Sequence, residues 1–324
     1  MNTPLLILFA PDVYVFVAVL LMVAFTLAAL WCCRRWRRRW LYAVALVLVL
    51  TGWSALFYGA FVGIRGLKVR HVEYISADLP AAFDGYRIVQ FSDAHVASLN
   101  GFRQPLLQQA VDSILAQHPD LVVFTGDLQN KRADEIDPHR DQLSRIKAKD
   151  GVVSIFGNHD YPMYIDADAY EKAWLFDRTR TAEEQLGWTV LLNRHTVIRR
   201  GADSIVVAGM ENDGEGRYPS KGDVVTTLTG VSHESFIIML EHDPSSWRRS
   251  ILPPAHCQLT LSGHTHGGQL QLLGWSPAAM KYREYAGMYY VGRQALNVST
   301  GLGGVVPMRW GVAPEIVVIT LRKQ

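Results

Sequence analysis

Two long apolar segments near the N-terminus limit, more than any other feature, what this chain of 324 residues can fold into. The first spans residues 13–33, about 21 positions, and the second spans residues 41–63, about 23 positions. An α-helix rises ~1.5 Å per residue, so each segment is long enough to cross the ~30 Å hydrocarbon core of a bilayer. The sequence therefore predicts a membrane-spanning helical hairpin in residues 1–66 and a separate domain in residues 67–324.

Two other interpretations of these segments fit the residues less well. A secretory signal peptide would begin with basic residues and end at small ones, whereas the first segment has no basic start and is followed by arginines. A pair of buried core helices would usually keep one polar face, and neither segment has one.

The charges that flank the two segments indicate an orientation. The exit flank carries three basic residues, Arg65, Lys68 and Arg70, whereas the short connection "RRWRRRW" carries five. The five are Arg34, Arg35, Arg37, Arg38 and Arg39. Because basic residues favour the cytoplasmic side, we expect the connection there and the larger domain on the extracytoplasmic face of the inner (cytoplasmic) membrane.

Charge also separates the two parts of the chain. Residues 1–70 hold eight Lys or Arg and one Asp, a net +7, so the formal +2 of the whole chain leaves −5 for residues 71–324. Nonspecific binding to nucleic acid needs clustered Lys and Arg along one face. We therefore expect no nucleic-acid partner. Nothing in the sequence indicates an oligomeric state.

Past the hairpin, short β-branched runs alternate with longer amphipathic ones, which is typical of an α/β domain. The expected helices cover residues 104–117, 134–149, 169–186 and 245–251. Residues 269–298 contain mostly strand and turn patterns, which suggests a second sheet packed on the first. Eight runs have the composition of strands, and they begin at Tyr86, Leu121, Gly151, Ser204, Ser235, Cys257, Ala295 and Glu315.

Five of these predicted strands end in residue types that bind metals. Because the carboxyl ends of parallel strands share one edge of a sheet, we expect these side chains to converge although they span about 170 positions of the chain. Each motif alone is an ordinary turn or cap, and only the combination is informative. The residues are Asp93 and His95 in "SDAH", Asp127 in "TGD", Asn158 and His159 in "GNHD", His242 in "LEHDP", and His264 and His266 in "SGHTH".

Together these motifs resemble the calcineurin-like metallophosphoesterases, and within them the membrane-anchored bacterial phosphodiesterases that carry "GHTHGGQ". The resemblance runs from Val69 to the C-terminus and includes "AAFDGYRIVQFSD" before the first motif. It implies a sandwich of two mixed β-sheets flanked by helices. Ala94 stands where the family usually has Leu, and Asn130 where an acidic residue is common, but neither position binds metal in the family pattern.

The resemblance also implies two divalent metal ions bridged by Asp127. One ion would be held by Asp93, His95, Asp127 and His266, and the other by Asp127, Asn158, His242 and His264. Nitrogen and oxygen ligands without a thiolate suit Mn, Fe or Zn. Glycines at 263, 267 and 268 would let the turn aim its two histidines at different ions, since glycine tolerates positive φ and close backbone approach.

In this family pattern, a hydroxide that bridges the metals attacks phosphorus in line with the leaving oxygen. His159 would face the leaving group and stabilise its charge or donate a proton, and Asp160 would orient His159. The expected enzyme is a membrane-anchored phosphodiesterase, with a phosphoester substrate that the anchor suggests is lipid-linked. Two alternatives remain at this point: a phosphomonoesterase, and a receptor or scaffold domain that uses the metals for structure.

A cluster of aromatic residues follows the last metal motif. Packing on the sheet is the simpler interpretation of this cluster. A lip that faces the membrane or an acyl chain is the alternative, because aromatic side chains favour the lipid interface. The residues are Trp275, Tyr282, Tyr285, Tyr289 and Tyr290.

Overall fold

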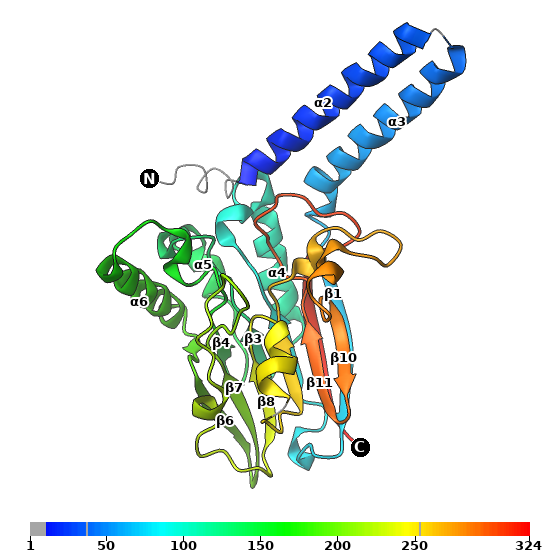
Figure 1. Cartoon of the computed structure of the whole chain (residues 1–324). Helices are drawn as coiled ribbons and strands as arrows, with labels where there is room; N and C mark the ends of the chain where they lie inside the picture. The colour runs from blue at the N-terminus through cyan, green and yellow to red at the C-terminus, as the bar shows by residue number, and fades with distance from the viewer. Residues whose placement is uncertain (1–10, 37, 253) are drawn as a thin grey trace.

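The computed structural model describes residues 11–36, 38–252 and 254–324, and it consists of a helical hairpin that projects from a β-sandwich (Figure 1). The hairpin is formed by α2 (Pro11–Trp36) and α3 (Arg39–Phe57), and the chain leaves α3 through one π-helical turn, Tyr58–Gly63. Arg37 of the arginine-rich connection lies outside the described residues.

The surface of the hairpin is apolar and uncovered. Both helices are long and apolar enough to cross a membrane, and large side chains such as Leu21 and Leu46 are more than half exposed. One polar contact joins the helices, in which the Trp53 Nε1–H donates to the Thr26 hydroxyl at 3.2 Å. Hydrogen bonds of this kind hold helices together in lipid, where apolar packing alone discriminates poorly. The predicted pair of apolar helices is confirmed.

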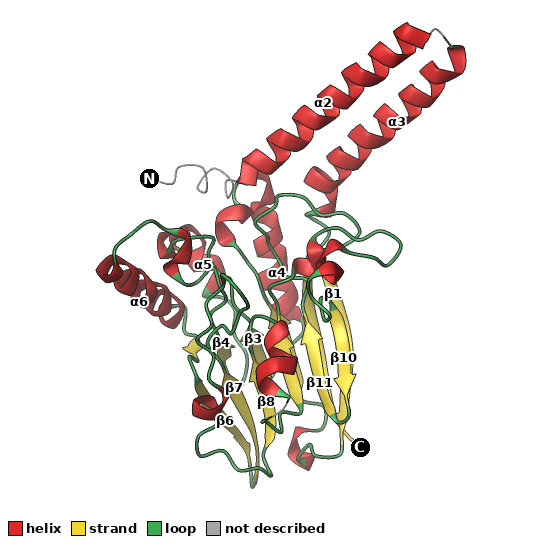
Figure 2. Ribbon diagram, viewed as in Figure 1, coloured by secondary structure: helices red, strands yellow, loops and turns green. Residues whose placement is uncertain are grey.

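The strands of the chain form two six-stranded mixed sheets that pack face to face, as predicted (Figure 2). The first sheet has the order β1 (Lys68–Ser76), β12 (Glu315–Lys323), β2 (Arg87–Phe91), β3 (Leu121–Phe124), β4 (Val152–Ser154) and β5 (Thr189–Val190). The second has the order β10 (Gly287–Val291), β11 (Gln294–Val298), β9 (Leu259–Ser262), β8 (Phe236–Leu240), β7 (Asp203–Gly209) and β6 (Arg194–Arg200).

Within each sheet, the strands that precede the metal motifs run parallel. In the first sheet β2, β3 and β4 are parallel neighbours, and in the second β8 and β9 are. The loops at their carboxyl ends therefore leave each sheet at the same edge. The predicted convergence takes place across two sheets rather than along one.

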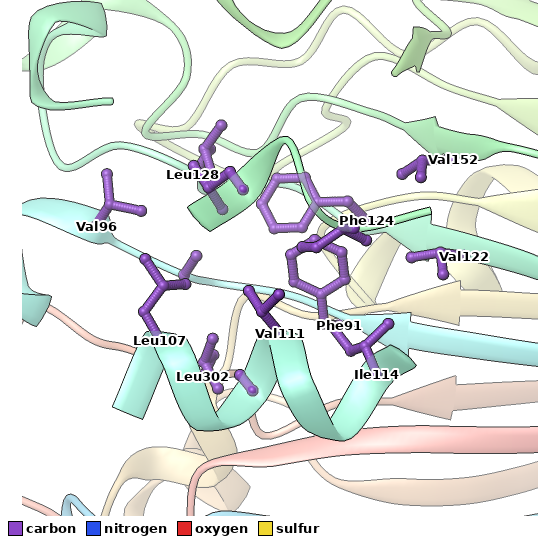
Figure 3. Close-up of a cluster of buried hydrophobic side chains, with 14 of the residues drawn as sticks. Phe91, Val96, Leu107, Val111, Ile114, Val122, Phe124, Leu128, Val152 and Leu302 are labelled. Atoms are coloured by element: carbon purple, nitrogen blue, oxygen red, sulfur yellow. The ribbon is translucent and has the colours of Figure 1, made fainter. Parts of the chain in front are cut away.

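Alternation of side chains along the strands builds one hydrophobic cluster between the sheets and one on the outer face of each sheet. In β3, Leu121 and Val123 point between the sheets, while Val122 and Phe124 point to the other face and pack under α4 (Gln104–Ala116). Figure 3 shows the cluster under α4, in which Phe91 and Phe124 have ring centroids 4.7 Å apart. Because these strands are covered on both faces, they appear in the sequence as unbroken apolar runs.

The helices are predicted with one error. The expected helices at 104–117 and 169–186 are α4 and α6 (Ala169–Gln185), and the run at 245–251 is a helical turn that ends in π geometry. The continuous helix expected at 134–149 is wrong. The segment begins with two 3₁₀ turns, Ala133–Glu135 and Asp137–His139, and the second contains Pro138, which has no N–H to donate. Its only α-helical part is the four-residue α5 (Arg140–Leu143). A further four-residue helix, α7 (Val224–Thr227), packs beside β6.

Candidate metal centre

The predicted ligands converge where loops from the two sheets meet. The Asp93 carboxylate, after β2, accepts a hydrogen bond from the backbone N–H of His264, after β9, at 3.0 Å. The ring of His242, after β8, donates through Nδ1 to the carbonyl of Thr125, after β3, at 2.7 Å. These two contacts join the sheets directly at the site.

Three of the residues form a first ligand cluster. The side chains of Asp93, His95 and His266 offer ligand atoms that all lie within 4.8 Å of one another. The His266 Nε2 atom is 3.5 Å from the Asp93 carboxylate, and the His95 and His266 ring centroids are 5.1 Å apart. One carboxylate and two imidazoles at this spacing suit a single divalent cation.

Asp127, His242 and His264 form a second ligand cluster beside the first. The Asp127 Oδ2 atom lies 3.2 Å from His242 Nε2 and 3.5 Å from His95 Nε2. Asp127 therefore stands between the two clusters. The His242 hydrogen bond to Thr125 fixes its tautomer, so that Nε2 is the nitrogen that faces Asp127.

Tyr282 orients the ring of His264 in this second cluster. His264 Nε2 is 2.7 Å from the Tyr282 hydroxyl, while His264 Nδ1 is 3.3 Å from His242 Nε2. With the proton on Nε2, the Nδ1 lone pair points into the cluster. Tyr282 belongs to the aromatic run that we expected to pack on the sheet, so its contact with a ligand was missed.

The buried polar atoms at the site test whether a cation fits. In the described part of the chain, both ring nitrogens of His95, Nδ1 of His266 and Oδ1 of Asn158 are buried without a hydrogen-bond partner. Each such atom costs about 1–3 kcal/mol when nothing pairs with it. The Asn158 amide is oriented by its Nδ2 group, which donates to the Tyr164 hydroxyl at 2.7 Å. These unpaired nitrogen and oxygen atoms fit metal ligation.

The backbone at the site is strained at the ligands themselves. A positive φ is uncommon outside glycine, and it persists only where the surrounding structure enforces it. We expected glycines to carry this strain, and Gly267 and Gly268 do have positive φ. Five predicted ligands share it, namely Asp93 (50°), His95 (43°), Asp127 (61°), His264 (71°) and His266 (51°).

Two positions in the neighbouring turns require glycine because carboxylate side chains lie close to the backbone there. A Cβ atom at Gly263 would collide with the Asp93 carboxylate and the Ser92 hydroxyl, and one at Gly157 would collide with the Asp127 carboxylate. Both positions therefore need glycine so that a carboxylate can sit against the backbone.

His159 belongs to a third group of ligand atoms, since one of its ring nitrogens and atoms of His95 and Asp127 all lie within 4.8 Å of one another. Its ring is held by the main chain. Its Nδ1–H donates to the carbonyl of Asn130 at 2.6 Å, and its ring stacks on Tyr164 with centroids 4.4 Å apart. Its backbone N–H donates to the Asp127 carboxylate at 2.7 Å. Because Nδ1 is engaged, Nε2 is the ring nitrogen left to contact a cation or another molecule.

Asp160 supports the site through hydrogen bonds to the main chain. Its carboxylate accepts hydrogen bonds from the backbone N–H groups of Asp127 (2.7 Å), Leu128 (2.9 Å) and Gly157 (2.8 Å). We expect Asp160 to orient His159, and the two are linked through Asp127, whose N–H donates to Asp160 and whose carboxylate accepts the His159 N–H. The contact with the His159 ring itself is made by the carbonyl of Asn130. Asp160 fixes the turns that carry Asp127 and Asn158.

Burial sets the protonation of most of the histidines. It lowers the pKa of His95 to about 3 and that of His264 to about 4, so both rings are neutral at pH 7 and offer lone pairs. Burial acts the same way on His242, but the Asp127 carboxylate outweighs it and raises the pKa of His242 to about 10. A cation that replaces the His242 proton would therefore bind more tightly as pH rises.

The residues that orient the candidate ligands could not be recognised in the sequence. Thr125 and Asn130 act through backbone carbonyls, which any residue type would supply, so their identities carry no signal. Tyr164 and Tyr282 do act through their hydroxyls, but they are marked only as aromatic residues near a motif.

This fold and this cluster of carboxylates and imidazoles define a metal-dependent phosphoester hydrolase. Residues 86–268 match the model of the calcineurin-like phosphoesterase family, and the chain belongs to that family. The chain is similar to the metallophosphoesterase YkuE of Bacillus subtilis (strain 168), with 34% identity over 76% of this chain and 82% of that protein.

Two further relatives widen the comparison. A transmembrane protein with metallophosphoesterase domain from Danio rerio is 32% identical over 86% of this chain and 62% of its own length. The phosphodiesterase YaeI of Escherichia coli (strain K12) is 26% identical over 88% of this chain and 98% of its own length.

Proposed function

We propose that this chain is a dinuclear metal phosphodiesterase in which residues 1–66 are the membrane anchor and residues 67–324 the catalytic domain. The position of Asp127 carries the proposal, because its Oδ2 atom lies within 3.5 Å of one histidine from each cluster. The first ion is assigned to Asp93, His95, Asp127 and His266, and the second to Asp127, Asn158, His242 and His264.

The charge of the site suits a phosphoester. Asp93 and Asp127 contribute two negative charges. Asn158 contributes none, and neither do the histidines once a cation has replaced the His242 proton. When bound, two divalent ions (Mn, Fe or Zn) would supply Lewis-acid charge and activate a water. The resulting net charge of about +2 would attract one phosphate group.

His159 is the residue assigned to the leaving group. Its Nδ1–H is engaged by Asn130, and burial lowers its pKa below the ordinary value. The neutral ring therefore presents Nε2, which can hold a water or polarise the departing oxygen. The stack on Tyr164 keeps the ring in this orientation.

The membrane anchor suggests where the substrate is found. We place the hairpin in the inner membrane and the catalytic domain on its extracytoplasmic face, supported by the basic residues that flank the apolar helices. A phosphoester or pyrophosphate bond of a lipid-linked molecule would be presented at that surface. Diester rather than monoester hydrolysis is supported by the similarity to YaeI, which is named a phosphodiesterase.

Elemental analysis of the full chain in detergent, combined with assays on chromogenic mono- and diesters, tests the proposal. We expect two divalent ions per chain and diester turnover. The Asp127→Asn variant should lose metal and at least ~10³-fold in turnover, because the metals contribute several kcal/mol to the transition state. Faster monoester hydrolysis would favour a phosphomonoesterase, and metal without turnover would favour a scaffold.

A further inference from the structure

The segment that follows the last metal motif exposes an unusual apolar surface. We call residues 270–280 the apolar loop. It begins four positions after His266 and contains no acidic residue, and Lys281 and Arg283 follow it directly. Five of its side chains are large, apolar and exposed to solvent, namely Leu270, Leu272, Leu273, Trp275 and Met280.

The tip of this loop is unfavourable in water for two reasons. Leu272 and Trp275 pair through two hydrogen bonds of 2.9 Å, and the residues between them, Leu273 and Gly274, have φ values of 51° and 83°. Two-residue turns with positive φ at both positions favour Asn-Gly. Leu273 instead holds a strained backbone and leaves 99% of its side chain exposed. A leucine at this position is explained if something apolar covers it.

Hydrogen bonds place the apolar loop beside the end of the membrane hairpin. The Gln271 N–H donates to the carbonyl of Trp310 at 2.7 Å, and the Arg309 N–H donates to the carbonyl of Gly59, in the last turn after α3, at 3.0 Å. Gly59 lies in the span Arg39–Gly63 that is long enough to cross a membrane. Figure 1 shows the loop, in orange, at the end of the sandwich from which the hairpin projects.

The same segment is tied to the metal centre. The Arg309 guanidinium is buried and donates to the carbonyls of Thr300 and Gly303, and the Gly303 N–H donates to the Asp93 carbonyl at 2.7 Å. The end of the hairpin, the apolar loop and a metal-ligand loop therefore form one connected unit.

We propose that the apolar loop is a second membrane contact, which inserts Leu273 and its apolar neighbours into the bilayer that holds the hairpin. The inference rests on the membrane anchor of the proposed function. Continuity with the hairpin identifies the partner as that bilayer, and Lys281 and Arg283 at the end of the loop favour anionic headgroups. The metal centre then opens at headgroup level, where the phosphoester of a lipid is within reach.

Spin-label accessibility in the full chain tests this contact. The chain is reconstituted in vesicles of phosphatidylcholine and phosphatidylglycerol, with Cys32 and Cys33 replaced by Ala and the fully buried Cys257 left in place. A nitroxide is attached to Leu273→Cys or, in a second variant, to Met280→Cys, which tests the same loop if the first fails to fold. Metal content verifies the fold of each variant.

Two matched positions calibrate the result. Leu46→Cys, on α3, reports the lipid environment, and Val225→Cys, an exposed apolar position on α7, reports water. We expect labels at 273 and 280 to be accessible to oxygen and protected from a water-soluble nickel chelate, as at 46. Chelate accessibility equal to that at 225 would refute the membrane contact. A wild-type chain without diester turnover would refute the enzyme assignment instead, and the labels would still decide the contact.

Discussion

The hairpin and the metal centre depart from the usual arrangement of a folded chain in opposite ways. In the hairpin, large apolar side chains are exposed and no part of the described chain covers them. At the metal centre, polar ring and amide atoms are buried, and no part of the described chain pairs with them. Each arrangement is unfavourable in water alone. Each would become favourable with a partner of matching chemistry, which in the proposed function is a bilayer for the first and cations for the second.

The two arrangements differ in how closely they specify the partner. An exposed apolar surface indicates only the class of its partner, because lipid contacts are nondirectional. Buried imidazole and carboxylate atoms within 4.8 Å of one another indicate the partner's charge, size and ligand preference. The metal centre therefore supports a far more specific hypothesis than the hairpin does.

Among the variants below, His159→Ala should have the largest effect, and it tests whether His159 acts on the substrate or binds a cation. We expect turnover of a chromogenic diester to fall about 10²- to 10⁴-fold, the usual contribution of a general acid or base, while both metals are retained. The measurements are steady-state kinetics and elemental analysis. His195→Ala, on β6, is the matched control and should retain activity. Loss of metal in His159→Ala would make that ring a ligand.

Two side-chain truncations compare the exposed surface of the hairpin with the buried core of the sandwich. Phe124→Ala removes a ring that packs on Phe91 and Trp188, and it should lower the unfolding free energy of the sandwich by about 3–5 kcal/mol. Leu46→Ala, on the exposed face of α3, should change it by less than about 0.5 kcal/mol. Thermal unfolding in detergent, followed by near-UV circular dichroism, measures both. Equal effects would mean that the hairpin face is part of the sandwich core.

Most helices and strands could be predicted because each one leaves a pattern of apolar residues within its own segment of the sequence. Both apolar helices and all eight predicted strands are present, since membrane spans and strands covered on both faces leave continuous apolar runs. The four strands that we did not predict individually, β1, β5, β6 and β10, are half-exposed or very short. The helix predicted at 134–149 failed in its first half because Pro138 cannot donate a main-chain hydrogen bond.

The residues that converge at the candidate metal centre could be proposed from the sequence, but the groups that orient them could not. Ligand identity requires particular residue types, so Asp127 and His242 are visible in the sequence. Orientation is performed by carbonyls such as Thr125 and Asn130, and by hydroxyls that reach the site through tertiary packing, such as Tyr282. The hydrogen bonds of Asp160 likewise go to backbone N–H groups, which any residue type except proline supplies.

Glu183, on α6, shows that a buried, unpaired polar group need not indicate a cation. In the described part of the chain neither carboxylate oxygen has a hydrogen-bond partner, yet Glu183 belongs to no ligand cluster. Burial, together with the nearby Asp160 carboxylate, raises the pKa of Glu183 well above its ordinary value of 4.5. Protonation, rather than a metal, neutralises this group.

The pH dependence of Glu183→Gln tests this distinction. A raised pKa means that the folded state holds the proton, so the stability that Glu183 contributes is complete below pH 4.5 and falls as pH rises toward its folded pKa. Glutamine keeps the neutral shape and does not titrate. As pH rises above 4.5 and until it approaches the folded pKa, the variant should therefore gain on the wild type by up to about 1.4 kcal/mol per pH unit. Glu184→Gln, at the exposed neighbouring position, should show no such trend in thermal unfolding. A flat Glu183→Gln difference would mean that Glu183 is ionised and paired, and the contrast with the metal centre would fail.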